Sequence, residues 1–84
     1  MKRNQEELTN KERQILWGAI LRAKREKNGV TQEVLSKYLD IDQSTLARYE
    51  QGKIPMNLNN FVRICEFLRI TPNEILNYGT DFED

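Results

Sequence analysis

Apolar residues recur along this chain at the three- and four-residue spacing of helices, and typical helix-start and helix-stop residues bracket each run. The first run opens on Thr9-Asn10-Lys11-Glu12, which has the form of a capping box. Trp17, Ile20 and Leu21 follow at helical spacing, and Lys27-Asn28-Gly29 closes the run. Lysine suits the last turn of a helix and glycine adopts the positive φ of a C-terminal cap, so a first helix is predicted between these two signals.

Two short helices separated by a tight turn are predicted next. Thr31 can cap a helix from Gln32 to about Leu39, and Asp40-Ile41-Asp42 makes a polar turn. The last aspartate of this turn is a suitable N-cap for a third helix from Gln43 to Gln51, which Gly52 closes. The second helix is expected to bury one apolar face, made of Val34, Leu35, Tyr38 and Leu39.

The remaining chain predicts two more helices. Lys53-Ile54-Pro55-Met56 is expected to be extended, because a residue before proline is pushed out of the α region. Asn57 can cap a fourth helix from Leu58 to about Leu68. Thr71-Pro72-Asn73-Glu74 is a second capping box, with proline at the first position of a short fifth helix that runs through Leu76. The expected apolar stripe of the fourth helix is Leu58, Phe61, Val62, Ile64, Cys65 and Leu68.

These five helices, with no alternating strand pattern to compete, predict an all-α fold, a five-helix bundle. Residues from Tyr78 onward are expected to form a frayed acidic tail. The predicted core consists of conspicuous apolar side chains at helical spacing: Trp17, Leu21, Leu35, Leu39, Leu46, Phe61, Ile64 and Leu68. Cys65 is expected to be a buried small hydrophobe rather than a redox sensor.

The charged residues bear on function through their distribution along the chain rather than through their sum. Thirteen Lys and Arg balance thirteen Asp and Glu, so the formal net charge is zero. On its own this balance argues against nucleic-acid binding, which usually goes with a strongly basic domain. Residues 1–63, however, hold twelve basic and eight acidic residues, whereas residues 64–84 hold one and five. Nucleic acid therefore stays open as a partner.

The missing residue types narrow the chemistry. With no histidine, the chain lacks the commonest general base and metal ligand, and its single cysteine can form neither an intramolecular disulfide nor a Cys/His zinc cluster. No glycine-rich phosphate loop occurs either. We therefore expect no enzyme activity, no metal and no cofactor. A lone thiol fits a reducing compartment, and no apolar run reaches the roughly 18 residues of a membrane span, so a cytoplasmic protein is expected.

The short helix, tight turn and second short helix over residues 31–51 match a helix-turn-helix, which places its second helix in the DNA major groove. This spacing also occurs in helical bundles that bind no DNA. The expected outer face of the third helix carries four polar residues: Gln43, Ser44, Thr45 and, one turn on, Arg48. Glutamine can pair with adenine, arginine with guanine, and serine or threonine with several base edges. These side chains are predicted to read bases; the alternative is an ordinary solvated face.

Two segments of the motif closely resemble the helix-turn-helix of the phage Cro and repressor type, also called the XRE family. They run from Val30 to Ser36 and from Ile41 to Lys53, and the resemblance extends without a gap from about Trp17 to Leu76. It implies a five-helix, lambda repressor-like DNA-binding domain that is usually dimeric on palindromic operators. The chain is accordingly divided into an N-terminal extension of the first helix (1–16), the helix-turn-helix domain (17–76) and an acidic tail (77–84).

The resemblance also implies roles by position. Base-reading residues would be Gln43, Ser44 and Arg48. Phosphate-binding residues would be Thr31, Gln32, Gln51 and Lys53. The first two of these four stand at the start of the second helix, where free N–H groups and the helix dipole favour an anion, and the other two stand at the end of the third helix. Arg25 and Glu50 would form an internal ion pair that ties the first helix to the end of the third.

The predicted partner is double-stranded DNA, and the predicted function is a transcriptional regulator, a repressor that binds a two-fold operator as a homodimer. The expected dimer surface is made of apolar residues beyond the predicted core: Leu76, Tyr78 and Phe82. Two alternatives stay open. One is the antitoxin of a toxin–antitoxin pair, which would also bind a small partner protein, and copurification of that protein would favour it. The other is a helical protein-interaction module that has lost DNA binding, and binding indifferent to salt would favour it.

Overall fold

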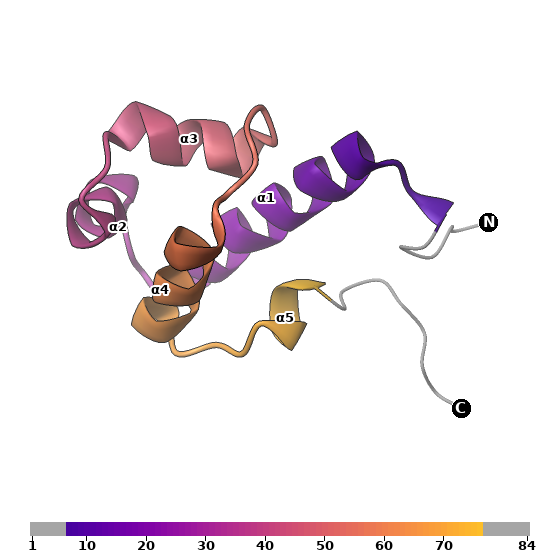
Figure 1. Cartoon of the computed structure of the whole chain (residues 1–84). Helices are drawn as coiled ribbons and strands as arrows, with labels where there is room; N and C mark the ends of the chain where they lie inside the picture. Colours follow the sequence, from indigo (N-terminus) through magenta and orange to yellow (C-terminus); the bar gives the residue numbers. More distant parts are fainter. Residues whose placement is uncertain (1–6, 77–84) are drawn as a thin grey trace.

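A computed structural model describes residues 7–76 of the chain and contains five helices (Figure 1). They are α1 (Asn10–Lys27), α2 (Gln32–Leu39), α3 (Gln43–Gln51), α4 (Leu58–Leu68) and α5 (Asn73–Leu76). No strand occurs between residues 7 and 76, so the prediction of an all-α, five-helix fold is confirmed. None of the helices in this range is long and apolar enough to cross a membrane.

The helix ends follow the predicted capping signals. At the start of α1, Thr9 Oγ1 accepts the backbone N–H of Glu12 at 3.0 Å, and Glu12 Oε1 accepts that of Thr9 at 3.0 Å, which completes the capping box. Thr31 and Asn57 cap α2 and α4 in a similar way, each side chain accepting the N–H three residues further on. The predicted bounds of α2, α3 and α4 agree with the structure because these signals are local.

Two predicted caps differ from the structure in detail. Asp42 occupies the N-cap position of α3, but its side chain makes no capping hydrogen bond to that helix. At α5, Glu74 Oε2 accepts the N–H of Thr71 at 2.9 Å, whereas the N–H of Glu74 donates to the Thr71 carbonyl at 3.0 Å rather than to its hydroxyl. Only half of the second capping box is formed, and Pro72 precedes the first residue of α5 instead of occupying it.

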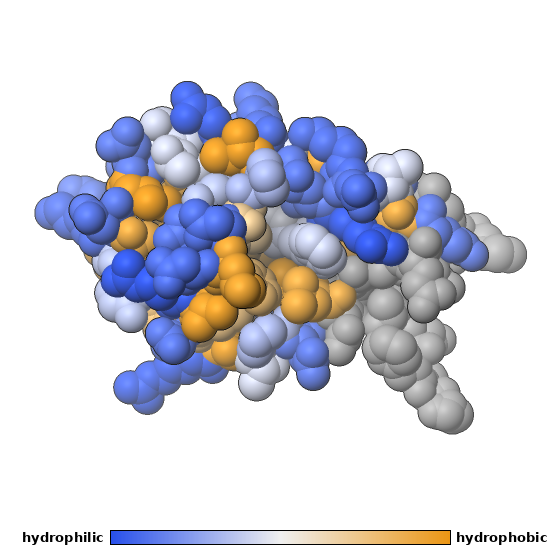
Figure 2. Space-filling view, viewed as in Figure 1, coloured by the Kyte–Doolittle hydropathy of each residue, from blue (hydrophilic) through white to orange (hydrophobic). Residues whose placement is uncertain are grey.

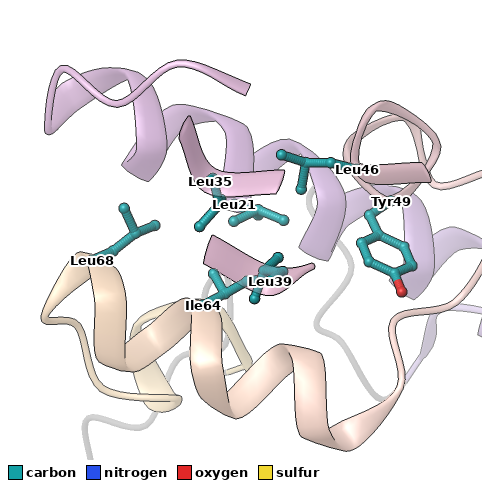
Figure 3. Close-up of a cluster of buried hydrophobic side chains, with 7 residues drawn as sticks. All are labelled: Leu21, Leu35, Leu39, Leu46, Tyr49, Ile64 and Leu68. Atoms are coloured by element: carbon teal, nitrogen blue, oxygen red, sulfur yellow. The ribbon is translucent and has the colours of Figure 1, made fainter. Parts of the chain in front are cut away.

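The core lies where α1 to α4 meet and consists of one main cluster and one smaller one. The main cluster is shown in Figure 3: Leu21, Leu35, Leu39, Leu46, Tyr49, Ile64 and Leu68. The smaller cluster joins Ile20, Cys65 and Ile75, and so attaches α5 to α1 and α4. Trp17 and Phe61, predicted as core, are half-buried and pack against this second cluster. Cys65 is buried, as predicted, and this burial raises the pKa of its thiol.

The apolar faces predicted for α2 and α4 are wider than those that the structure buries. Val34 and Tyr38 on α2 and Leu58 and Val62 on α4 are all exposed, Leu58 by 75%. Val62 precedes buried Ile64 by two residues, and residues two apart on a helix point roughly 200° away from each other, so Val62 lies nearly opposite Ile64. Leu58 is the first residue of α4. Figure 2 shows orange apolar patches among hydrophilic side chains on the face where α4 lies.

Candidate nucleic-acid interface

Helix α3 lies along one edge of the domain, with α2 beside its first turn and α1 running beneath it (Figure 1). Its inner side is fixed by Leu46, which is fully buried, and by Tyr49, whose hydroxyl accepts a hydrogen bond from buried Asn60 of α4 at 2.9 Å. Its outer side presents the predicted base-reading residues. Of these, Gln43, Ser44 and Arg48 are exposed, whereas Thr45 is half-buried.

The C-terminal half of α3 rests directly on α1. A Cβ atom added at Gly18 of α1 would overlap the carbonyl oxygens of Tyr49 and Glu50. Gly52, the C-cap of α3, has a φ of 71°, and a Cβ there would lie 2.5 Å from Ile15 Cα. Glycine at both positions therefore lets the two backbones approach each other more closely than any side chain would allow.

The ion pair expected between Arg25 and Glu50 joins the same two helices. Arg25 Nε lies 2.6 Å from Glu50 Oε2, and Arg25 Nη2 donates to Glu50 Oε1 at 3.0 Å. The side chains are only 8% and 2% exposed. Arg25 Nη1 also donates to the carbonyl of Val30 in the α1–α2 connection at 2.8 Å. The hydrogen bond to Glu50 raises the pKa of Arg25 above its ordinary value.

Two predicted DNA-contacting glutamines extend this pair toward the outer surface. Gln32 Nε2 donates to Glu50 Oε1 at 3.0 Å, and Gln43 Nε2 lies 3.4 Å from Gln32 Oε1. A predicted phosphate contact of α2 is thereby placed against a predicted base contact of α3. Because an amide group has two N–H donors and a carbonyl, Gln43 keeps one N–H and its Oε1 for the donor and acceptor of an adenine edge.

The other predicted phosphate contacts stand at opposite ends of the motif. Thr31 is exposed at the N-terminus of α2, where its hydroxyl caps the helix. Gln51 and Lys53 are exposed on either side of Gly52, where the chain leaves α3. The exposed residues of α3 thus lie between two sets of groups that could hold phosphates on the flanking backbone.

Sequence reasoning missed two side chains that reach this region from α1. Lys11 Nζ donates to the carbonyl oxygen of Gly52 at 2.7 Å, and Gln14 Nε2 donates to the same oxygen at 2.8 Å. These contacts span 41 and 38 residues of sequence, so no local pattern predicts them. The one available signal is a lysine in the first turn of a helix, where its charge opposes the helix dipole.

One charged residue near the C-terminal end of α1 has a partner on α5. Lys24 pairs with Glu74 of α5 at 3.1 Å. The pKa of Glu74 is lowered, first by the backbone hydrogen bond from Thr71 and then by Lys24. Between residues 7 and 76, no three His, Cys, Asp or Glu side chains are grouped so that they could hold a metal ion.

The sequence model of a helix-turn-helix family matches residues 21–75. The restriction-modification controller protein C.AhdI from Aeromonas hydrophila is 30% identical; the match covers 73% of this chain and 92% of that one, with a TM-score of 0.68. No curated protein matches the chain.

Two further solved structures share the fold at lower identity. The P22 c2 repressor, solved with a synthetic operator, is 24% identical over 73% of this chain and 92% of that one, with a TM-score of 0.67. The clp gene regulator ClgR from Corynebacterium glutamicum is 23% identical over 76% of this chain and 68% of that one, with a TM-score of 0.73.

Proposed function

Because the chain belongs to the helix-turn-helix family of the phage Cro and repressor type, and is therefore a DNA-binding transcriptional regulator, we propose that it is a cytoplasmic repressor that binds a palindromic operator as a homodimer. Helix α3 enters the major groove with its outer face toward the bases. One observation carries the proposal: exposed Gln43, Ser44 and Arg48 share the outer side of a helix whose inner side is locked to α1 and α4.

The side chains of α3 divide the readout of the bases. Arg48 pairs with the O6 and N7 atoms of a guanine, and Gln43 pairs with the N6 and N7 atoms of an adenine. The contact to Gln32 supports this role for Gln43, because it holds the amide in place before DNA arrives. Ser44 is exposed and bonds a neighbouring base edge, whereas half-buried Thr45 contributes at the margin of the contact.

The phosphate contacts hold α3 in register on the duplex. Thr31 and Gln32 bring the N-terminus of α2, with its unpaired N–H groups and positive dipole end, against one phosphate. Gln51 and Lys53 hold the backbone beyond the other end of α3. Such contacts position the protein and are indifferent to base sequence.

Dimerisation supplies the affinity that one domain lacks, since a single module buries only about 600–1,000 Å² on DNA. Two-fold symmetry then places the half-sites about 34 Å apart. We propose that residues 17–76 are the DNA-binding domain. Of the predicted N-terminal extension, 1–16, residues 10–16 form the first turns of α1, and residues 1–6 lie outside the described residues. Of the expected dimer surface, Leu76 ends α5 and is half-buried, while Tyr78 and Phe82, in the acidic segment 77–84, lie outside the described residues.

Arg48→Ala is expected to lower affinity for the selected operator by about 1–3 kcal/mol and to relax base preference at one position of each half-site. The reason is the loss of a bidentate contact to guanine. Selection from random duplex DNA with both proteins, followed by titration of the winning sequence, measures both effects. Unchanged affinity and preference would mean that α3 does not read bases through this face, and enrichment of no sequence by the parent protein would favour an interaction module without DNA binding.

Lys53→Ala is expected to weaken binding to every duplex alike and to reduce the slope of log affinity against log salt by about one unit. A lysine that holds a phosphate releases roughly one counterion, and it carries no information on base sequence. Salt titrations on the operator and on a mixed-sequence duplex measure the slope. A loss confined to the operator would instead make Lys53 a base-reading residue.

A further inference from the structure

Two side chains from the first turns of α1 converge on one carbonyl at the end of α3. The oxygen of Gly52 accepts Lys11 Nζ at 2.7 Å and Gln14 Nε2 at 2.8 Å. That carbonyl belongs to the peptide group that joins Gly52 to Lys53. The backbone N–H of Lys53 donates to the carbonyl oxygen of Arg48 at 2.9 Å. The ammonium of Lys11 therefore lies one peptide unit from the backbone of a proposed phosphate contact.

The position of Lys11 is unfavourable within its own helix. It is the second residue of α1, where the positive end of the helix dipole repels a cation. The same ammonium lies at the C-terminal end of α3, where the dipole is negative and a cation is favourable. The stability of α1 by itself therefore does not account for a lysine at this place.

The carbonyl of Gly52 does not need a charged partner. Gln14 alone donates a well-placed hydrogen bond to it, so a neutral residue at position 11 would leave no unsatisfied acceptor. An ammonium has three donors and the carbonyl uses one of them. Lys11 remains exposed, and the carbonyl that it contacts belongs to Gly52, which stands between exposed Gln51 and Lys53 in the chain. The lysine therefore adds a positive charge, rather than a needed hydrogen bond, to the C-terminal end of α3.

We propose that Lys11 is a further DNA phosphate-binding residue, whose ammonium is shared between the Gly52 carbonyl and the phosphodiester that Gln51 and Lys53 flank. This inference rests on the proposed function. The close approach of α1 to α3 at Gly18 and Gly52 fixes where the first turns of α1 lie relative to the C-terminal end of α3. The ammonium of Lys11 is therefore positioned before DNA binds. The first turns of α1 thereby form an outer edge of the DNA-contacting surface.

The test is a salt titration of Lys11→Gln on a mixed-sequence duplex, with Arg69→Asn as the control. The control removes one positive charge from the far end of α4, and asparagine tolerates the left-handed φ of 58° found at Arg69. We expect Lys11→Gln to reduce the salt slope by about 0.9, so its affinity deficit is about 3.5-fold larger at about 50 mM than at about 200 mM salt. The control variant is expected to keep the parent slope.

Two additional variants separate the outcomes. Lys11→Arg retains the charge and is expected to keep the parent slope even if its thermal stability changes. Lys53→Ala tests the proposed function by itself. If Lys53→Ala flattens the slope and Lys11→Gln does not, Lys11 only caps α3 and the inference is wrong. If the parent protein binds DNA without dependence on salt, the proposed function is wrong as well.

Discussion

Replacing Arg25 with methionine is expected to lower the free energy of unfolding by about 3–5 kcal/mol. The substitution keeps an unbranched side chain but leaves the carboxylate of Glu50, 2% exposed, without its bidentate partner. It also removes the donor to the Val30 carbonyl. Since small domains are stable by about 5–15 kcal/mol, this single change removes a large part of the total. Urea denaturation followed by the fluorescence of Trp17, the only tryptophan, measures the loss.

The same helix offers a matched control. Arg22 forms an ion pair with Glu26 at 3.0 Å, but the two side chains are 62% and 53% exposed. Arg22→Met is therefore expected to cost only about 0.3–0.5 kcal/mol, the usual value for an exposed pair one turn apart. Equal losses for the two variants would show that burial of the Arg25 pair contributes nothing.

A double variant tests the cause of the loss. Replacing Glu50 with leucine in the Arg25→Met background removes the uncompensated charge, and apolar pairs often substitute for buried ion pairs without penalty. We expect this double variant to regain most of the lost stability. Failure to regain it would place the loss in packing or in the missing donor to the Val30 carbonyl, rather than in the unpaired carboxylate of Glu50. The double variant also provides a folded protein if Arg25→Met alone does not fold.

The fold was largely predictable because its signals are local. Signals such as the capping side chains of Thr31 and Asn57 and the closing glycine Gly52 act within one helix turn, and α2, α3 and α4 begin and end close to the predicted residues. The widths of the buried faces were not predictable in the same way. Whether Val34 or Leu58 is covered depends on which neighbouring helix lies against it, and that information is spread over the whole chain.

The candidate site shows the same contrast between features set by local sequence and features set by contacts between distant residues. The exposure of Gln43, Ser44 and Arg48 on α3 could be deduced from residue type and spacing, but Thr45, predicted on the same face, is half-buried. The links behind them could not: Gln32 meets Glu50 across 18 residues, and Lys11 meets Gly52 across 41. Such contacts depend on how the helices cross. A continuous set of bonds runs from the buried Arg25 pair through Gln32 to Gln43, which connects a proposed base-reading side chain to the core.

Gly52→Ala is expected to destabilise the protein by roughly 2–5 kcal/mol, and Gly29→Ala is the matched control. The two glycines have nearly the same positive φ, 71° and 70°. Alanine in this region costs about 1–2 kcal/mol at either site. At Gly29 nothing lies within 4 Å of the new Cβ, whereas at Gly52 it would lie 2.5 Å from Ile15 Cα and 2.9 Å from Ile15 N. Overlap with a helix backbone adds about 1–3 kcal/mol.

The extra cost at Gly52 has a functional consequence that Gly29→Ala lacks. The backbone of Ile15 cannot yield as a flexible side chain would, so α1 must move away from the end of α3. That movement lengthens the bonds from Lys11 and Gln14 to the Gly52 carbonyl and releases the C-terminal end of α3. Under conditions where both variants are folded, Gly52→Ala should therefore bind DNA more weakly than Gly29→Ala. Equal unfolding free energies for the two variants, measured by urea denaturation, would show that the backbone of Ile15 does not restrict the side chain at position 52.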